Sequence, residues 1–191
     1  MSLYSEKRAI SMNDLEKLRQ RYKETMQKLD NLRQAKRKLI QQKRGFNIDQ
    51  AEFERQYFQI VASEKKLLTE IYDLDINIKV CQLERLFQEN KFVTAFWRPK
   101  AYALPLVPSR GKPFILKRKI RTPCGHEVDL IKHALALQEP KRSFYLDGYL
   151  RAFREPFHET YGTIEQEIVC PKCGRKHVLT LELKPLPEEP Q

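Results

Sequence analysis

The second half of the chain is organised around residues 168–179, which read IVCPKCGRKHVL. Apolar residues on both sides of a short polar turn predict a strand, a tight turn and a second strand. Cys170 and Cys173 are separated by two residues within this turn, and Pro171 stiffens it. Gly174 lets the backbone fold so that amide groups point at the sulfur atoms. Two thiolates at this spacing can bind one tetrahedral metal ion.

A C-P-x-C-G turn between two strands resembles the knuckle of a zinc ribbon, and the resemblance covers about ten residues. It implies a small β-rich domain stabilised by one structural Zn²⁺ ion. A redox C-x-x-C motif normally opens a helix after a strand, whereas residues 175–179 continue as a strand pattern. The local sequence therefore favours metal binding over redox chemistry.

A second turn should supply the remaining ligands. Residues 120–128, IRTPCGHEV, again place a turn between apolar segments, and Cys124 and His126 stand there at C-x-H spacing. Together with Cys170 and Cys173 they form a candidate site of three cysteines and one histidine. His177 is the rival fourth ligand, and this choice stays open in the sequence.

The first 98 residues predict a long antiparallel helical hairpin. Apolar residues alternate at steps of three and four on both sides of Gly45, the only glycine before residue 111, and such a stripe must meet another helix. The first stripe contains Leu15, Leu18, Tyr22, Thr25, Leu29, Leu32, Lys36 and Leu39. The second contains Phe53, Tyr57, Ile60, Glu64, Leu67, Ile71, Leu74, Ile78 and Cys81. Asn47 or Asp49 can cap the second helix.

The cysteine on this stripe, Cys81, is expected to be a small buried hydrophobe and not a ligand. The end of the second helix, taken to include Phe92, Phe96 and Trp97, is apolar on more than one side. It is expected to pack on the second domain, on the N-terminal segment around residues 3–10, or on a partner.

The sequence thus predicts an α+β protein. Its expected parts are a hairpin over 1–98, a basic proline-rich linker over 99–113, a zinc-ribbon-like domain over 114–184 with a helical insertion at about 129–160, and a tail over 185–191. Within the insertion, aromatic residues at helical spacing between 144 and 157 are expected to belong to the core.

The chain is basic, with 36 Lys+Arg against 25 Asp+Glu and a net charge of +11. Residues 98–121 hold eight cations and no acid, which suits a phosphate backbone or an acidic protein groove. These candidate binding residues are Arg98, Lys100, Arg110, Lys112, Lys117, Arg118, Lys119 and Arg121. Residues 28–44 of the hairpin are a second basic region, with seven cations and one acid.

No run of 18 apolar residues and no secretory signal is visible, so neither a membrane nor an export route is expected. With two of four cysteines in C-x-x-C, a cytoplasmic or other reducing compartment is favoured over disulfides. A virus particle is also compatible with this chemistry. A thiolate-rich site and the lack of an H-E-x-x-H motif indicate no catalytic residues and no enzyme.

Three functions fit these features. The first is a non-enzymatic interaction protein whose coiled coil and zinc domain contact nucleic acid or a nucleoprotein or viral assembly. The second is a structural part of a large particle, such as a phage virion, that binds only protein. The third rests on a resemblance: bacterial RNA-polymerase secondary-channel factors also join a coiled-coil hairpin to a zinc module. Their hairpin tips are acidic, whereas here Arg37, Lys38, Lys43 and Arg44 flank Asp49 and Glu52.

Overall fold

The computed structural model describes residues 12–89, 92–98, 111–153 and 162–183. It confirms the α+β class, with two long helices followed by short antiparallel strands and two shorter helices. The chain divides into two compact units, Met1–Ile78 and Lys79–Gln191, so the second unit includes the end of the second long helix. No helix in the described ranges combines the length and the apolar character needed to cross a membrane.

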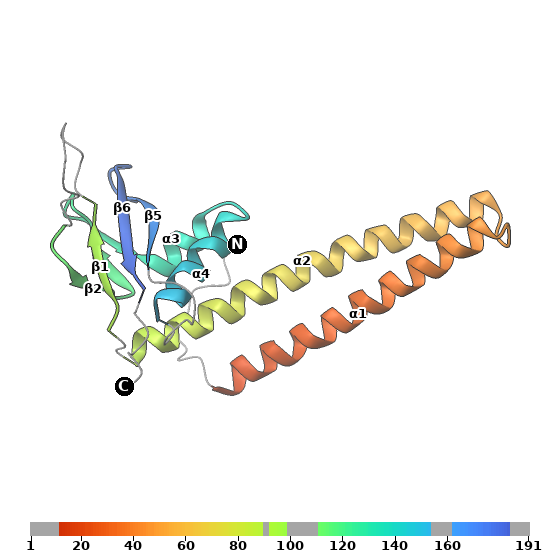
Figure 1. Cartoon of the computed structure of the whole chain (residues 1–191), viewed down its shortest axis with the longest axis horizontal. Coiled ribbons are helices and arrows are strands. Elements are labelled where there is room, and N and C mark those ends of the chain that lie inside the picture. The colour runs from red at the N-terminus through yellow and green to blue at the C-terminus, as the bar shows by residue number, and fades with distance from the viewer. Residues whose placement is uncertain (1–11, 90–91, 99–110, 154–161, 184–191) are drawn as a thin grey trace, which may run out of the picture. The chain divides into compact units, whose positions relative to one another are not determined.

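The first unit is built from helix α1, Met12–Arg44, and helix α2, Gln50–Gln88, which continues into the second unit. The two helices run antiparallel beside one another (Figure 1). Of the two predicted caps for α2, Asp49 is the one that acts, because its carboxylate accepts a hydrogen bond from the N–H of Ala51 at 3.0 Å.

The two predicted stripes face inward. Every stripe position from Leu15 to Ile78 is buried or half-buried, whereas most residues between them are exposed. The two charged members of the stripes, Lys36 and Glu64, meet each other at 2.8 Å. Since a charge at an inward position needs a partner of opposite sign, this pair helps to fix which residues of α1 and α2 lie side by side.

The end of the second long helix corrects one expectation. Residues 92–97 were assigned to that helix, but α2 ends at Gln88 and Thr94–Trp97 form strand β1. β1 lies between two other strands in its sheet, which satisfies its backbone groups on both sides. β-branched and aromatic residues such as Thr94, Phe96 and Trp97 are typical of a central strand. Pairing with distant strands therefore makes this segment a strand, although the residues before it follow a helical pattern.

The second unit contains two small antiparallel sheets. The four-stranded sheet has the order β2-β1-β6-β5 and the two-stranded sheet pairs β3 with β4. Their bounds are β1 Thr94–Trp97, β2 Phe114–Ile115, β3 Lys119–Arg121, β4 Glu127–Asp129, β5 Thr163–Val169 and β6 Lys176–Glu182. β5 and β6 form a hairpin whose register pairs Val169 with Lys176 at the turn.

Two helices lie between the sheets in the chain, as the predicted insertion requires: α3, Leu130–Ala136, and α4, Lys141–Phe153. Asp129 caps α3 by accepting a hydrogen bond from the N–H of Lys132. α4 is joined to β5 because the Tyr145 hydroxyl donates to the carbonyl of Glu167 at 2.7 Å. Most of the aromatic cluster is core, with Tyr149 and Phe153 at most 1% exposed, although Phe144 is exposed; Phe157 lies outside the described residues.

The last turns of α2 pack within the second unit, which is one of the three alternatives left open by the sequence. Leu83 is completely buried, and the rings of Phe87 and Phe153 meet edge to face with centroids 4.9 Å apart. Lys79 adds an ion pair with Asp147 at 2.9 Å. The small sheets therefore share their core with helical residues from the first half of the sequence.

Candidate metal centre

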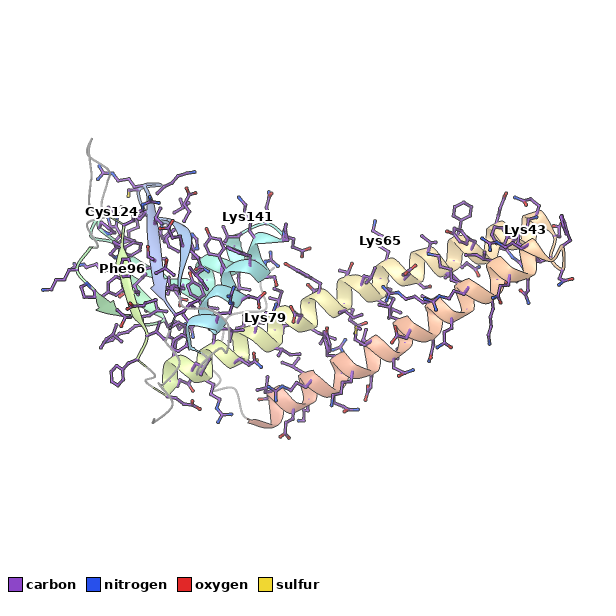
Figure 2. All side chains as sticks on the ribbon, viewed as in Figure 1. Lys43, Lys65, Lys79, Phe96, Cys124 and Lys141 are labelled. Carbon is purple, nitrogen blue, oxygen red and sulfur yellow. The ribbon has the colours of Figure 1, made fainter. Side chains whose placement is uncertain are left out.

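Two β-turns of the second unit form the candidate metal centre. One joins β3 to β4 and carries Cys124 and His126, and the other joins β5 to β6 and carries Cys170 and Cys173. Figure 2 shows Cys124 at the end of the unit where these turns lie. Each turn contains a glycine in the left-handed region, Gly125 with φ 86° and Gly174 with φ 68°. A side chain would strain the backbone there, so both glycines are needed for the tight reversals.

The four donor atoms lie within 4.8 Å of one another. Tetrahedral zinc with bonds of about 2.3 Å to sulfur and 2.0 Å to nitrogen would separate two sulfur ligands by about 3.8 Å and a sulfur from a nitrogen by about 3.5 Å. The Sγ atoms of Cys124 and Cys173 are 3.5 Å apart, and His126 Nδ1 is 3.6 Å from Cys124 Sγ and 3.3 Å from Cys170 Sγ. These three separations lie within about 0.3 Å of the tetrahedral values, so the arrangement has the dimensions of a four-coordinate site.

The β5–β6 turn directs backbone amides at its sulfur atoms, as Gly174 predicts. Burial raises the pKa of the Cys170 thiol, but hydrogen bonds from the N–H groups of Cys173 and Lys172 outweigh it and lower the pKa overall. Cys173 accepts from the N–H of Arg175, yet partial loss of hydration and the two neighbouring sulfurs hold its pKa above the ordinary value. These amides would stabilise metal-bound thiolates, because a thiolate is a hydrogen-bond acceptor with a full charge.

In the β3–β4 turn, Thr122 supports both ligands. Its hydroxyl lies 3.1 Å from Cys124 Sγ and donates to the carbonyl oxygen of His126 at 2.8 Å. Turned toward the sulfur instead of the carbonyl, the single hydroxyl proton is the largest of the influences that lower the pKa of Cys124 to about 5, with smaller contributions from His177 and the other two cysteines. Hydrogen bonds with Cys124 and then Cys170 raise the pKa of His126.

The two rival ligands differ in position. His126 belongs to the four-donor cluster. The His177 ring is not part of that cluster and packs against Trp97 with centroids 5.8 Å apart, although it still helps to lower the pKa of Cys124. Cys81 lies in α2, is 8% exposed and is not part of the cluster, as expected. All four cysteines are unbonded, so the cluster holds three thiols.

Three further residues brace the turns, a role that the sequence does not indicate for any of them. His133 Nε2 accepts a hydrogen bond from the N–H of Val169 at 3.1 Å, beside the first cysteine of the β5–β6 turn. Arg121 Nε donates to the carbonyl of Gly125 at 3.2 Å, and the Trp97 indole donates to the carbonyl of Arg121 at 3.2 Å. The position of Thr122 two residues before Cys124 was the only sequence feature that pointed to its contact with the site, whereas His133 and Trp97 come from distant segments.

The eight candidate binding cations fall into different environments. Lys100 and Arg110 lie outside the described residues. Arg98 pairs with Glu165 at 3.2 Å and Lys119 with Glu127 at 3.4 Å. Arg118 donates to both Glu84 and Asp129, and Arg121 braces the β3–β4 turn. Among the described residues, Lys112 and Lys117 are exposed and form no ion pair.

Comparisons with family models, with curated proteins and with solved structures give no match to this chain. The site is a cluster of three cysteines and one histidine, able to hold one metal ion between two β-turns.

Proposed function

We propose that the cluster of Cys124, His126, Cys170 and Cys173 holds one Zn²⁺ ion with a structural role. The observation that carries this proposal is that three cysteine sulfurs and one histidine nitrogen from two separate turns lie within 4.8 Å of one another. Three thiolates and one imidazole fill all four positions of tetrahedral zinc and leave none for water. A closed site of this kind supports folding and not catalysis, so the function that we propose is not enzymatic.

Zinc would compensate for the small size of the two sheets. β3 and β4 are three residues each and form a separate sheet from β5 and β6. The ion would join the two hairpins at their turns by bonds to both, and would add to the side-chain contacts that already connect the turns. Since three thiols must stay reduced to bind the ion, we place the protein in a reducing compartment.

For this zinc-stabilised unit we propose a binding function directed at nucleic acid. Residues 171–176, which comprise the β5–β6 turn after Cys170 and the first residue of β6, are all exposed and include Lys172, Arg175 and Lys176 with no acid. Lys176 pairs with Glu167, while Lys172 and Arg175 have no ion pair among the described residues. Lys112 and Lys117 add two exposed cations in the same unit. Exposed cations without acidic partners supply the sequence-independent attraction to a phosphate backbone.

The test measures binding of a fluorescently labelled single-stranded oligonucleotide to the zinc-loaded full chain by anisotropy over a salt series. We expect affinity to fall with salt, at a logarithmic slope of about −0.7 per phosphate contacted. The double variant Lys172→Glu/Arg175→Glu should bind more weakly and with a shallower slope. A matched control, Lys132→Glu/Lys141→Glu, changes net charge equally on helices α3 and α4, and Figure 2 shows Lys141 well apart from Cys124.

If both double variants lost the same amount of affinity for the oligonucleotide, net charge alone would account for binding. That result would contradict a binding site at the β5–β6 turn. No binding even at low salt would reject the nucleic-acid function. In that case the second function, a protein-only component of a large assembly, would become the better account of the basic surface.

A further inference from the structure

The tip of the helical hairpin, residues 44–49, contains an aromatic side chain that the fold does not use. Phe46 is 94% exposed. Its backbone lies in the left-handed region with φ 56°, and it is the only described residue other than glycine with a positive φ. Bulky residues avoid this region because Cβ approaches the following carbonyl oxygen.

The backbone geometry explains why the strain falls on Phe46. Helix α1 ends in a Schellman motif with two backbone hydrogen bonds. The N–H of Asn47 donates to the carbonyl of Gln42 at 2.9 Å, and the N–H of Phe46 donates to the carbonyl of Lys43 at 3.2 Å. This pattern requires a left-handed residue at the position of Phe46, where glycine is the usual choice. The chain instead places Gly45 one residue earlier and a phenylalanine in the strained position.

Phe46 therefore weakens the hairpin in two ways. Its backbone is strained, and its ring, nearly all of it in water, gains almost nothing from burial. A strained residue with no packing role is grounds for a functional hypothesis. A contact outside the hairpin is the simplest role for such a ring.

The surroundings of Phe46 indicate the chemistry of that contact. Residues 33–44 of α1 hold six cations and no acid. Three of these cations are held within the hairpin: Arg33 and Lys36 bond to Glu64, and Lys43, labelled at the tip in Figure 2, lies over the Phe53 ring at 5.9 Å. The other three, Arg37, Lys38 and Arg44, are exposed and have no ion pair among the described residues.

We propose that this tip binds single-stranded nucleic acid, with the Phe46 ring stacked on a base and Arg37, Lys38 and Arg44 contacting phosphates. The proposal rests on the nucleic-acid function proposed above and assigns it a second site in the hairpin. An exposed ring beside unpaired cations is the pattern by which proteins bind single strands without reading their sequence. A single strand offers free base faces, so stacking need not first separate paired bases. A membrane-binding surface would need a broader apolar face than one ring.

The experiment uses the zinc-loaded full chain and a labelled single-stranded oligothymidylate. We expect Phe46→Ala and Phe46→Gly each to weaken binding by about 5- to 150-fold, the equivalent of one lost base stack. The matched control is Phe58→Ala, because Phe58 is also an exposed aromatic of the hairpin, at 68%, but lies in the regular part of α2. It should leave the affinity unchanged.

Thermal unfolding of the same variants separates contact from strain. Phe46→Gly should raise the hairpin melting temperature by a few degrees because glycine accepts the left-handed backbone, whereas Phe46→Ala should leave it close to that of the wild type. If the wild type binds the oligonucleotide but Phe46→Ala binds equally well, the tip site is wrong and the nucleic-acid function stands. If the wild type does not bind at low salt, the nucleic-acid function itself fails. Phe46-dependent binding to phosphatidylglycerol vesicles, without oligonucleotide binding, would overturn the proposal in favour of a lipid surface.

Discussion

Replacing Arg118 by methionine tests whether this residue of the basic region serves the fold instead of a ligand. Its Nη1 lies 3.0 Å from Glu84 Oε1 on α2, and its Nε lies 3.1 Å from Asp129 Oδ2, the residue that caps α3. The arginine side chain is 40% exposed, but its partners are only 20% and 11% exposed. One guanidinium therefore joins α2 to the start of α3 within the second unit.

The magnitude follows from this partial burial. Hydrogen bonds to charged groups contribute about 1.5–3 kcal/mol when sheltered, and exposed ion pairs about 0.2–1 kcal/mol. Two bonds of intermediate exposure should together contribute about 2 kcal/mol to the free energy of unfolding. Methionine keeps most of the apolar stem, so the loss reports the charged contacts.

The assay is urea unfolding of the zinc-loaded protein, followed by the fluorescence of Trp97, the single tryptophan, which lies in β1. The neighbouring Lys117→Met is the control, because Lys117 is exposed and forms no ion pair among the described residues. It should leave stability unchanged and weaken oligonucleotide binding. The reasoning would be refuted by a stability loss below about 0.5 kcal/mol for Arg118→Met, or by a binding loss as large as that of Lys117→Met.

Three other predictions concern the second unit. Burial lowers the pKa of His133 in the folded protein. Its neutral ring therefore contributes its full stability above the ordinary histidine pKa of about 6.5. That contribution is lost as the pH falls from about 6.5 through the lower pKa of the folded state. Relative to His133→Gln, which does not titrate, the wild type should lose unfolding free energy as the pH falls below about 6.5; a constant difference would contradict this. Gly111→Ala should cost about 1–3 kcal/mol, because its Cβ would lie 2.2 Å from the Trp97 carbonyl oxygen, whereas a Cβ at Gly162 meets no atom within 4 Å; equal Trp97 transitions for the two variants would disprove the clash. Cys81→Ala should keep the full zinc content measured by elemental analysis, and a drop would show that Cys81 takes part in the metal site.

The features that the sequence predicted well are those with a local physical cause. Heptad spacing fixes which helix faces must be covered, so the two stripes around Gly45 were recognisable without any distant partner. The C-P-x-C-G turn carries its own geometry, because the glycine and the two thiols are within five residues. Cys124 was recognisable by elimination, as the remaining cysteine after the hairpin.

The features that the sequence could not predict depend on distant contacts. Residues 94–97 continue an apolar helical pattern, and only pairing with β2 and β6 makes them a strand. Arg118 and Arg121 belong to a run of cations, and only the position of Glu84 and of the Gly125 carbonyl shows that both are engaged within the fold. Likewise, the strain at Phe46 arises because the hydrogen bonds that close α1 place the left-handed position one residue after Gly45, the residue that the sequence marks as the break.

The most direct test of the account is the zinc content of the reduced, purified protein by elemental analysis, measured together with the stability of the second unit. We predict one zinc per chain in the wild type and little or none in Cys173→Ala. That variant should lose the Trp97 unfolding transition at moderate denaturant while the helical signal of the hairpin persists. A folded wild type without zinc, or a second unit equally stable after chelation, would contradict a structural metal centre.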